Sequence, residues 1–83
     1  MLERIQVFTR GCSRSIIVEK NLRKAIDKMG LDIEIEASAD PAVAKEEDIQ
    51  SFPSVKINGD LRVDGDFTNV AEFQEMLSEY LDA

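Results

Sequence analysis

The stretch that decides the fold lies near the N-terminus and reads Ile5-Gln6-Val7-Phe8-Thr9-Arg10-Gly11-Cys12-Ser13-Arg14-Ser15. Its first half is β-branched and aromatic, which predicts a strand over 4–9. Gly11 interrupts this strand, and the later apolar spacing of Leu22, Ala25, Ile26 and Met29 predicts a helix from Ser13 onward. Gly30 stands where the C-terminal cap of that helix belongs. A strand, a tight loop with a cysteine and a long helix therefore open the chain.

The middle of the chain predicts a second strand and a second helix. Residues 31–36 alternate between apolar and acidic side chains, as in an edge strand with one buried face. Asp40 and Pro41 form a favourable helix start, because Asp caps free amides and Pro is tolerated in the first turn. We expect a short helix over about 41–48.

A hairpin is expected from 53–57 and 61–63 around Asn58-Gly59. A two-residue turn would place Val55 opposite Arg62, so the pattern favours a three-residue loop with Val55 opposite Leu61.

The last element is expected to be a helix beginning at Asn69, with Glu72 at capping-box spacing. Its predicted buried stripe comprises Val70, Phe73, Leu77, Tyr80 and Leu81. The predicted order is thus β-α-β-α-β-β-α in a single α/β domain, residues 1–83. It forms a four-stranded mixed sheet, parallel among the early strands and antiparallel at the last, with helices on both faces.

Composition excludes several classes of protein. The 83 residues support one modest core, and no apolar run reaches the roughly 20 residues of a membrane helix. The N-terminus lacks the pattern of a secretory signal, so we expect a cytoplasmic protein. A net charge of −7 argues against nucleic acid as a partner. With no His and one Cys, an internal disulfide, a zinc site of the usual kind and His-dependent nucleophilic catalysis are excluded.

The charge is unevenly distributed along the chain. Residues 1–30 carry seven cations and three anions, whereas residues 31–83 carry three cations and fourteen anions. This pattern indicates positive potential around Cys12, although solvated faces that happen to differ in sign explain it equally well.

Cys12 is the candidate for chemistry. It follows Gly11 at a strand-to-helix junction, where free amides and the helix dipole stabilise a thiolate. Arg10 and Arg14 flank it, and their charges are expected to lower the thiol pKa. A buried, inert cysteine is the alternative, but its polar neighbours are untypical of a core segment. Ser15, three residues on, shares its helix face and could hydrogen-bond the sulfur or be an ordinary first-turn serine.

Pro53 is the second candidate position. It stands in Phe52-Pro53-Ser54, at the start of a strand expected to be central, where proline is normally disfavoured. It is either simply the first strand residue or a cis proline that faces the thiol loop.

These motifs resemble the thioredoxin superfamily, and most of all the small glutaredoxin-like thioredoxins of archaea and bacteria. The resemblance covers residues 3–81 and rests on the 11–15 motif, on 49–54 before the third strand and on Gly65 after the fourth. It implies thiol–disulfide exchange with Cys12 as nucleophile and Pro53 as the cis proline. It also implies a substrate wall, to which we assign Gly11, Ser13, Arg14, Phe52, Pro53 and Gly65, with Phe52 offering backbone groups to an extended segment.

Ser15 departs from the family, because it stands where the resolving cysteine of Cys-x-x-Cys belongs. Three interpretations follow: an engineered Cys-to-Ser replacement, a natural form released by an outside thiol such as glutathione, or a monothiol glutaredoxin that binds an iron–sulfur cluster between two subunits. The 51–53 and 64–69 stretches differ from the Thr-Val-Pro and Gly-Gly motifs of that last group.

The expected partners of a monomeric protein of this kind are a disulfide-containing protein or small thiol and a reductase, with no resident cofactor or metal. A non-catalytic peptide-binding or cluster-binding module is the alternative.

Overall fold

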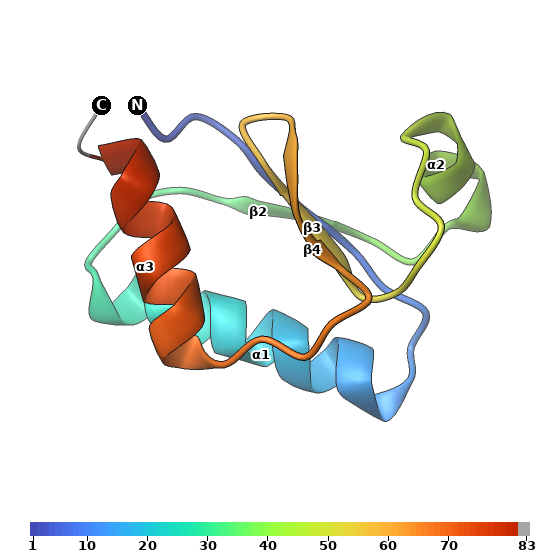
Figure 1. Ribbon diagram of the computed structural model, residues 1–83, viewed down its shortest axis with the longest axis horizontal. Coiled ribbons are helices and arrows are strands. Elements are labelled where there is room, and N and C mark those ends of the chain that lie inside the picture. Colours follow the sequence, from blue (N-terminus) through green and yellow to red (C-terminus); the bar gives the residue numbers. More distant parts are fainter. Residues whose placement is uncertain (82–83) are drawn as a thin grey trace.

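The computed structural model describes residues 1–81, and within them the element order is the predicted one (Figure 1). The strands and helices alternate as expected from the sequence until the final hairpin and helix. Their bounds are β1 Ile5–Phe8, α1 Ser13–Lys28, β2 Ile35–Ser38, α2 Pro41–Glu46, β3 Ser54–Ile57, β4 Asp60–Asp64 and α3 Val70–Leu81.

The four strands form one mixed sheet in the order β2-β1-β3-β4. β1 pairs with β2 in parallel, whereas β3 is antiparallel to both β1 and β4. The expectation of parallel pairing among the early strands is therefore wrong for β3. The reason is the shortness of α2: six residues of helix span only about 9 Å, so β3 starts near the end where β2 stops and runs back.

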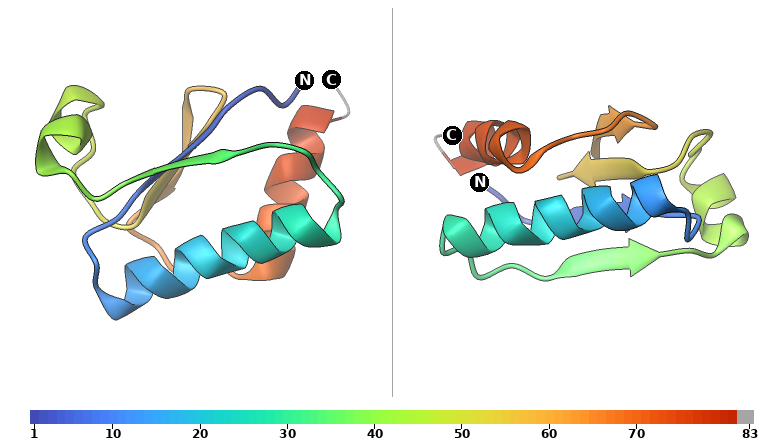
Figure 2. Two further views of the ribbon diagram at one scale, coloured as in Figure 1. Left: turned by 180° about the vertical axis from the view of Figure 1, so that it is seen from behind. Right: turned by 90° about the horizontal axis from the view of Figure 1, so that it is seen from below.

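Helices cover both faces of the sheet. In Figure 1 and in the left view of Figure 2, α1 runs below the strands, while α2 lies above and beyond one end of them. α1 and α3 share the main core with the strands, and its largest fully buried members include Ile5, Leu22, Phe73 and Leu77. On the other face Phe8 packs with the α2 residue Ala44 and with Ile49 in a second, smaller cluster. β1 is therefore buried along its whole length.

The second strand is shifted from its predicted position. Ile5, the first residue of β1, pairs with Ile35, so the residues before Ile35 have no β1 partner. Leu31 and Ile33 are nevertheless half-buried against the main core, which accounts for the alternating pattern without a strand. β2 is an edge strand, as the sequence predicts.

The hairpin turns in two residues, so the predicted three-residue loop is wrong. Ile57 pairs with Asp60 across Asn58-Gly59, and Val55 pairs with Val63. An irregularity in the register at Val55/Lys56 accommodates Arg62 as an extra residue, so the unfavourable Val55–Arg62 pairing does not arise.

α3 begins with the predicted capping box. Asn69 Oδ1 accepts a hydrogen bond from the Glu72 N–H at 2.8 Å, and Glu72 Oε1 accepts one from the Asn69 N–H at 3.0 Å. Phe73 and Leu77 are buried as expected. Leu81, the last residue of the helix, is 44% exposed and does not belong to the buried stripe.

Candidate active site

Cys12 occupies the N-cap position of α1 and is exposed. Gly11 before it has φ +76°, a conformation that side-chain-bearing residues rarely adopt, and this turn brings the chain from β1 into α1. No acidic residue lies in the first turn of α1. The thiol is therefore accessible at the positive end of a 16-residue helix.

Ser15 is the immediate partner of the thiol. Cys12 Sγ lies 3.2 Å from Ser15 Oγ, and the serine is fully buried. The pKa of Cys12 is lowered, first by the hydrogen bond with the Ser15 hydroxyl and then by the backbone N–H of Ser15, while desolvation opposes the shift. The backbone N–H groups of Arg14 and Cys12 lower the pKa further, because free amides at the start of a helix stabilise the charged thiolate.

The two flanking arginines contribute differently from the sequence-based expectation. Arg10 lies over the ring of Phe52, with its guanidinium carbon 5.4 Å from the ring centroid. Arg14 Nη1 donates to Gly65 O at 3.5 Å. The lowered pKa of Cys12 is caused by hydrogen bonds, and Arg14 contributes through its backbone N–H rather than its charge. The proposed tuning by guanidinium charge is therefore replaced by tuning through Ser15 and the helix amides.

Pro53 follows a cis peptide bond from Phe52, as one of the two sequence interpretations predicts. Its carbonyl accepts a hydrogen bond from the Gly65 N–H at 2.7 Å, which joins the start of β3 to the loop after β4. Gly65 has φ +82°, and a Cβ there would lie 2.8 Å from Ser51 Cβ. Only glycine fits this close approach between the two loops.

These contacts bring most of the predicted site residues to one end of the sheet. Arg10 lies over the ring of Phe52, and Arg14 donates a hydrogen bond to the carbonyl of Gly65. The loops that contain Phe52 and Gly65 are themselves joined by the Pro53–Gly65 hydrogen bond. Ser13 is exposed in the first turn of α1, and the structure assigns it no partner within residues 1–81.

The sequence interpretation overlooked an apolar surface beside this site. Ile17 and Phe67 are 47% and 55% exposed. Ile17 lies on α1 between Arg14 and Asn21, and both of these residues donate to the 65–68 loop that contains Phe67. The sequence does contain a sign of this surface. Arg14, Ile17 and Asn21 are spaced three and four residues apart, and this spacing places all three on one face of the helix.

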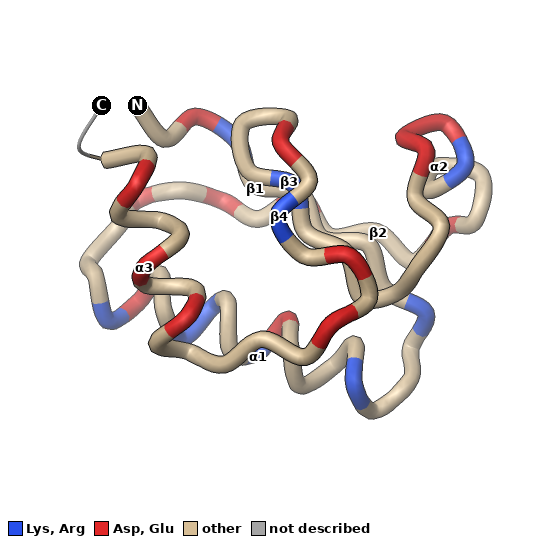
Figure 3. Tube along the Cα trace, viewed as in Figure 1, with Lys and Arg blue, Asp and Glu red and all other residues tan. Residues whose placement is uncertain are grey.

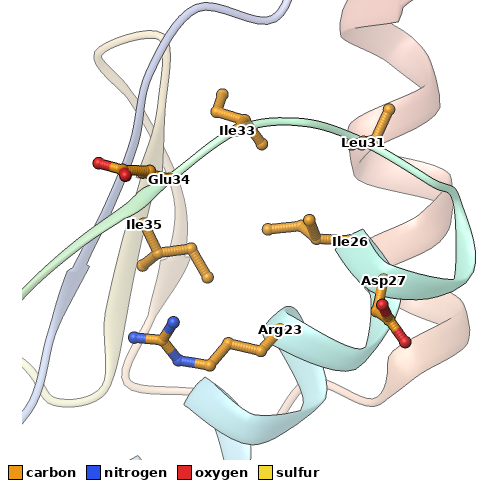
Figure 4. Close-up of a pocket in the computed structure, with 7 residues that line it drawn as sticks. All are labelled: Arg23, Ile26, Asp27, Leu31, Ile33, Glu34 and Ile35. Atoms are coloured by element: carbon orange, nitrogen blue, oxygen red, sulfur yellow. The ribbon is translucent and has the colours of Figure 1, made fainter.

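One hollow of the structure lies away from this site. It has a volume of about 490 Å³ and lies between the second half of α1 and the segment that leads into β2, where Ile26 and Ile35 point into it beside Arg23 (Figure 4). Arg23 is eleven residues along α1 from Cys12, or roughly 16 Å. This hollow is therefore separate from the thiol.

Neither a metal-ligand cluster nor a membrane-spanning helix occurs within residues 1–81. Their His, Cys, Asp and Glu side chains nowhere gather in groups of three or more that could hold a metal ion. None of the helices in this part of the chain combines the length and apolar character needed to cross a membrane.

A family model described as a thioredoxin domain matches residues 3–78. The chain belongs to the thioredoxin family. A curated protein named thioredoxin, from Methanothermobacter thermautotrophicus, is 28% identical over 75 residues, which cover 90% of this chain and 97% of that protein. The match includes both Cys12 and Pro53 within the thioredoxin domain, in agreement with the mixed sheet and three helices of the structure.

Proposed function

We propose that this thioredoxin-family protein carries out thiol–disulfide exchange with a single thiol, that of Cys12. The observation that carries the proposal is the exposed Cys12 sulfur at the N-terminus of α1, 3.2 Å from the buried Ser15 hydroxyl and with a lowered pKa. A thiolate is the attacking species in such exchange, and this site favours the thiolate.

In the first step, Cys12 Sγ attacks one sulfur of a substrate disulfide. A bond forms between Cys12 and that sulfur, the substrate S–S bond breaks, and the second substrate sulfur leaves as a thiolate that takes up a proton. The Ser15 hydroxyl donates to Cys12 Sγ while it is a thiolate. Ser15 has no sulfur, so it cannot release the mixed disulfide as a second cysteine would.

Release is assigned to an outside small thiol, such as glutathione. One equivalent attacks Cys12 Sγ, displaces the bound substrate sulfur as a thiolate and remains on Cys12. A second equivalent attacks the sulfur of that bound small thiol, frees the Cys12 thiolate and forms the disulfide of the small thiol. The substrate disulfide gains two electrons, and two small thiols lose them. Such chemistry suits a reducing compartment, and we assign the protein to the cytoplasm.

The remaining site residues have positioning roles in this proposal. Gly11, Ser13 and Arg14 form the thiol side of the substrate surface, and Phe52, Pro53 and Gly65 form the facing side. An extended substrate segment would lie beside Phe52 and pair with its backbone, a common mode of peptide recognition.

The test is mass spectrometry after mixing the reduced protein with bis(2-hydroxyethyl) disulfide, a small neutral disulfide. We expect one mercaptoethanol adduct per chain, located at Cys12, stable until a thiol is added and absent from Cys12→Ser. An unmodified wild-type chain under conditions where free cysteine reacts would overturn the proposal.

A further inference from the structure

A second hollow, of about 300 Å³, lies next to the candidate active site. Part of its wall is apolar and is formed by Ala39, Pro41, Ala44, Ile49 and Phe52, while Thr9, Arg10 and Lys45 complete the lining. Phe52 immediately precedes the cis Pro53, and Arg10 lies two residues before Cys12. The hollow is thus bounded by the two loops that flank the thiol.

The charge in this hollow has one sign. Arg10 and Lys45 line it, and none of the described lining residues is acidic. Within residues 1–81 neither cation takes part in an ion pair, whereas Arg4, Arg23, Lys56 and Arg62 each do. The acidic residues of this chain, whose net charge is −7, lie mainly on α3, on the β4 segment and at the two ends of α2, and those at the ends of α2 are absent from the lining of the hollow (Figure 3).

The position of Arg10 leaves its positive charge free to bind an anionic group. Its guanidinium lies over the Phe52 ring at 5.4 Å, and stacking on a ring holds the group in place without neutralising it. The edges of a stacked guanidinium still donate hydrogen bonds to a carboxylate. Phe52 therefore orients Arg10 at the border between the hollow and the proposed substrate path.

We infer that this hollow selects polypeptide substrates that carry an acidic side chain within about two residues of their reactive cysteine. The inference rests on the proposed exchange at Cys12. Two residues of extended substrate chain span about 7 Å, and Arg10 stands two residues before Cys12 in the sequence. The substrate carboxylate binds between Arg10 and Lys45, and the methylene groups of a Glu side chain contact the apolar wall.

The experiment compares two blocked peptides joined as symmetrical disulfides, acetyl-Glu-Gly-Cys-Gly-Glu-amide and its Gln counterpart. The rate of mixed-disulfide formation is measured at about 10 mM ionic strength for the unchanged protein, for Lys45→Glu and for Lys24→Glu. The two variants change the net charge equally, but Lys24 lies on α1 about 18 Å along the helix from Cys12. The neutral disulfide bis(2-hydroxyethyl) disulfide is measured in parallel.

We expect the unchanged protein and Lys24→Glu to react about three to ten times faster with the Glu peptide than with the Gln peptide, and this ratio to decrease at 0.5 M salt. We expect Lys45→Glu to remove or reverse the preference while its rate with the neutral disulfide stays unchanged. The inference is overturned if the unchanged protein reacts at about the same rate with the Glu and Gln peptides. It is also overturned if Lys24→Glu reduces the ratio of these two rates as much as Lys45→Glu does. If the unchanged protein does not react with the neutral disulfide, the proposed exchange at Cys12 itself is contradicted.

Discussion

The Ser15 hydroxyl is buried and lies 3.2 Å from the exposed sulfur of Cys12. The serine is fixed by the helix and by packing, whereas the sulfur faces solvent. The site therefore combines the exposed sulfur of Cys12 with a buried hydroxyl that can donate a hydrogen bond to its thiolate. The hydrogen bond between the two side chains lowers the pKa of Cys12 and so stabilises its thiolate.

Ser15→Ala is expected to raise the pKa of Cys12, because it removes the largest cause of its lowering. The rate of alkylation by iodoacetamide at pH 7 should fall by a factor of about two to ten, and the midpoint of its pH profile should move to higher pH. Ser13→Ala is the matched control, since Ser13 is exposed in the same turn and should leave the profile in place. Identical profiles for Ser15→Ala and the unchanged protein would show that the hydroxyl does not act on the sulfur.

The lowered pKa of Cys12 also predicts a pH-dependent difference in stability. A thiol whose folded pKa lies below its unfolded value of about 8.5 stabilises the folded state above that unfolded value, and this contribution is lost as pH falls through the folded pKa. The free energy of unfolding of the unchanged protein, minus that of Cys12→Ser, should therefore rise between neutral pH and pH 9.5. Urea titrations at both pH values measure it. A difference that stays constant or falls contradicts the assignment.

Gly65→Ala should destabilise the protein more than Gly59→Ala. Both glycines have positive φ, at +82° and +85°, but a Cβ at Gly65 meets Ser51 at 2.8 Å whereas a Cβ at Gly59 has open space. Backbone strain alone costs about 1–2 kcal/mol, and we expect Gly65→Ala to lose about 1 kcal/mol or more beyond that. Denaturant midpoints of the two variants give the comparison. Equal losses would mean that Ser51 moves away at little cost.

Asn69→Ala should cost about 1 kcal/mol of stability, because it leaves the Glu72 N–H at the start of α3 without its acceptor. Glu75→Ala, at an exposed position of the same helix, is the control and should change stability by less than about 0.5 kcal/mol. Thermal unfolding of both variants measures the two effects. A loss in Glu75→Ala as large as that in Asn69→Ala would contradict a specific role for the cap.

Local signals in the sequence predicted the order of elements well. The capping box at Asn69, the Asp40 cap and the interruption at Gly11 depend on neighbouring residues only, and the structure contains all three. The antiparallel direction of β3 could not be predicted from local signals, because it depends on how far the short α2 carries the chain. The hairpin register was missed for a similar reason: a bulge at Arg62 changes which side chains face each other, and no local pattern marked it.

Part of the site could also be predicted from the sequence. The place of Cys12 before a helix and its spacing to Ser15 follow from the helical repeat, and the Phe52–Pro53 bond is cis in the structure. The partners of Arg10 and Arg14 could not be predicted, because Phe52 and Gly65 lie about 40 and 50 residues away in the chain. Their placement is decided by the sheet order, which brings these loops to the same end as Cys12.

Steady-state reduction of a small disulfide tests the central claim most directly, with the unchanged protein, Ser15→Cys and Cys12→Ser assayed side by side. The account predicts that the unchanged protein turns over only while a small thiol such as glutathione is in excess, that reduced Ser15→Cys also converts one equivalent of the disulfide fully to thiols with no thiol added, and that Cys12→Ser is inactive under both conditions. If neither the unchanged protein nor Ser15→Cys turns over, or if Cys12→Ser retains the activity, thiol–disulfide exchange at Cys12 is contradicted.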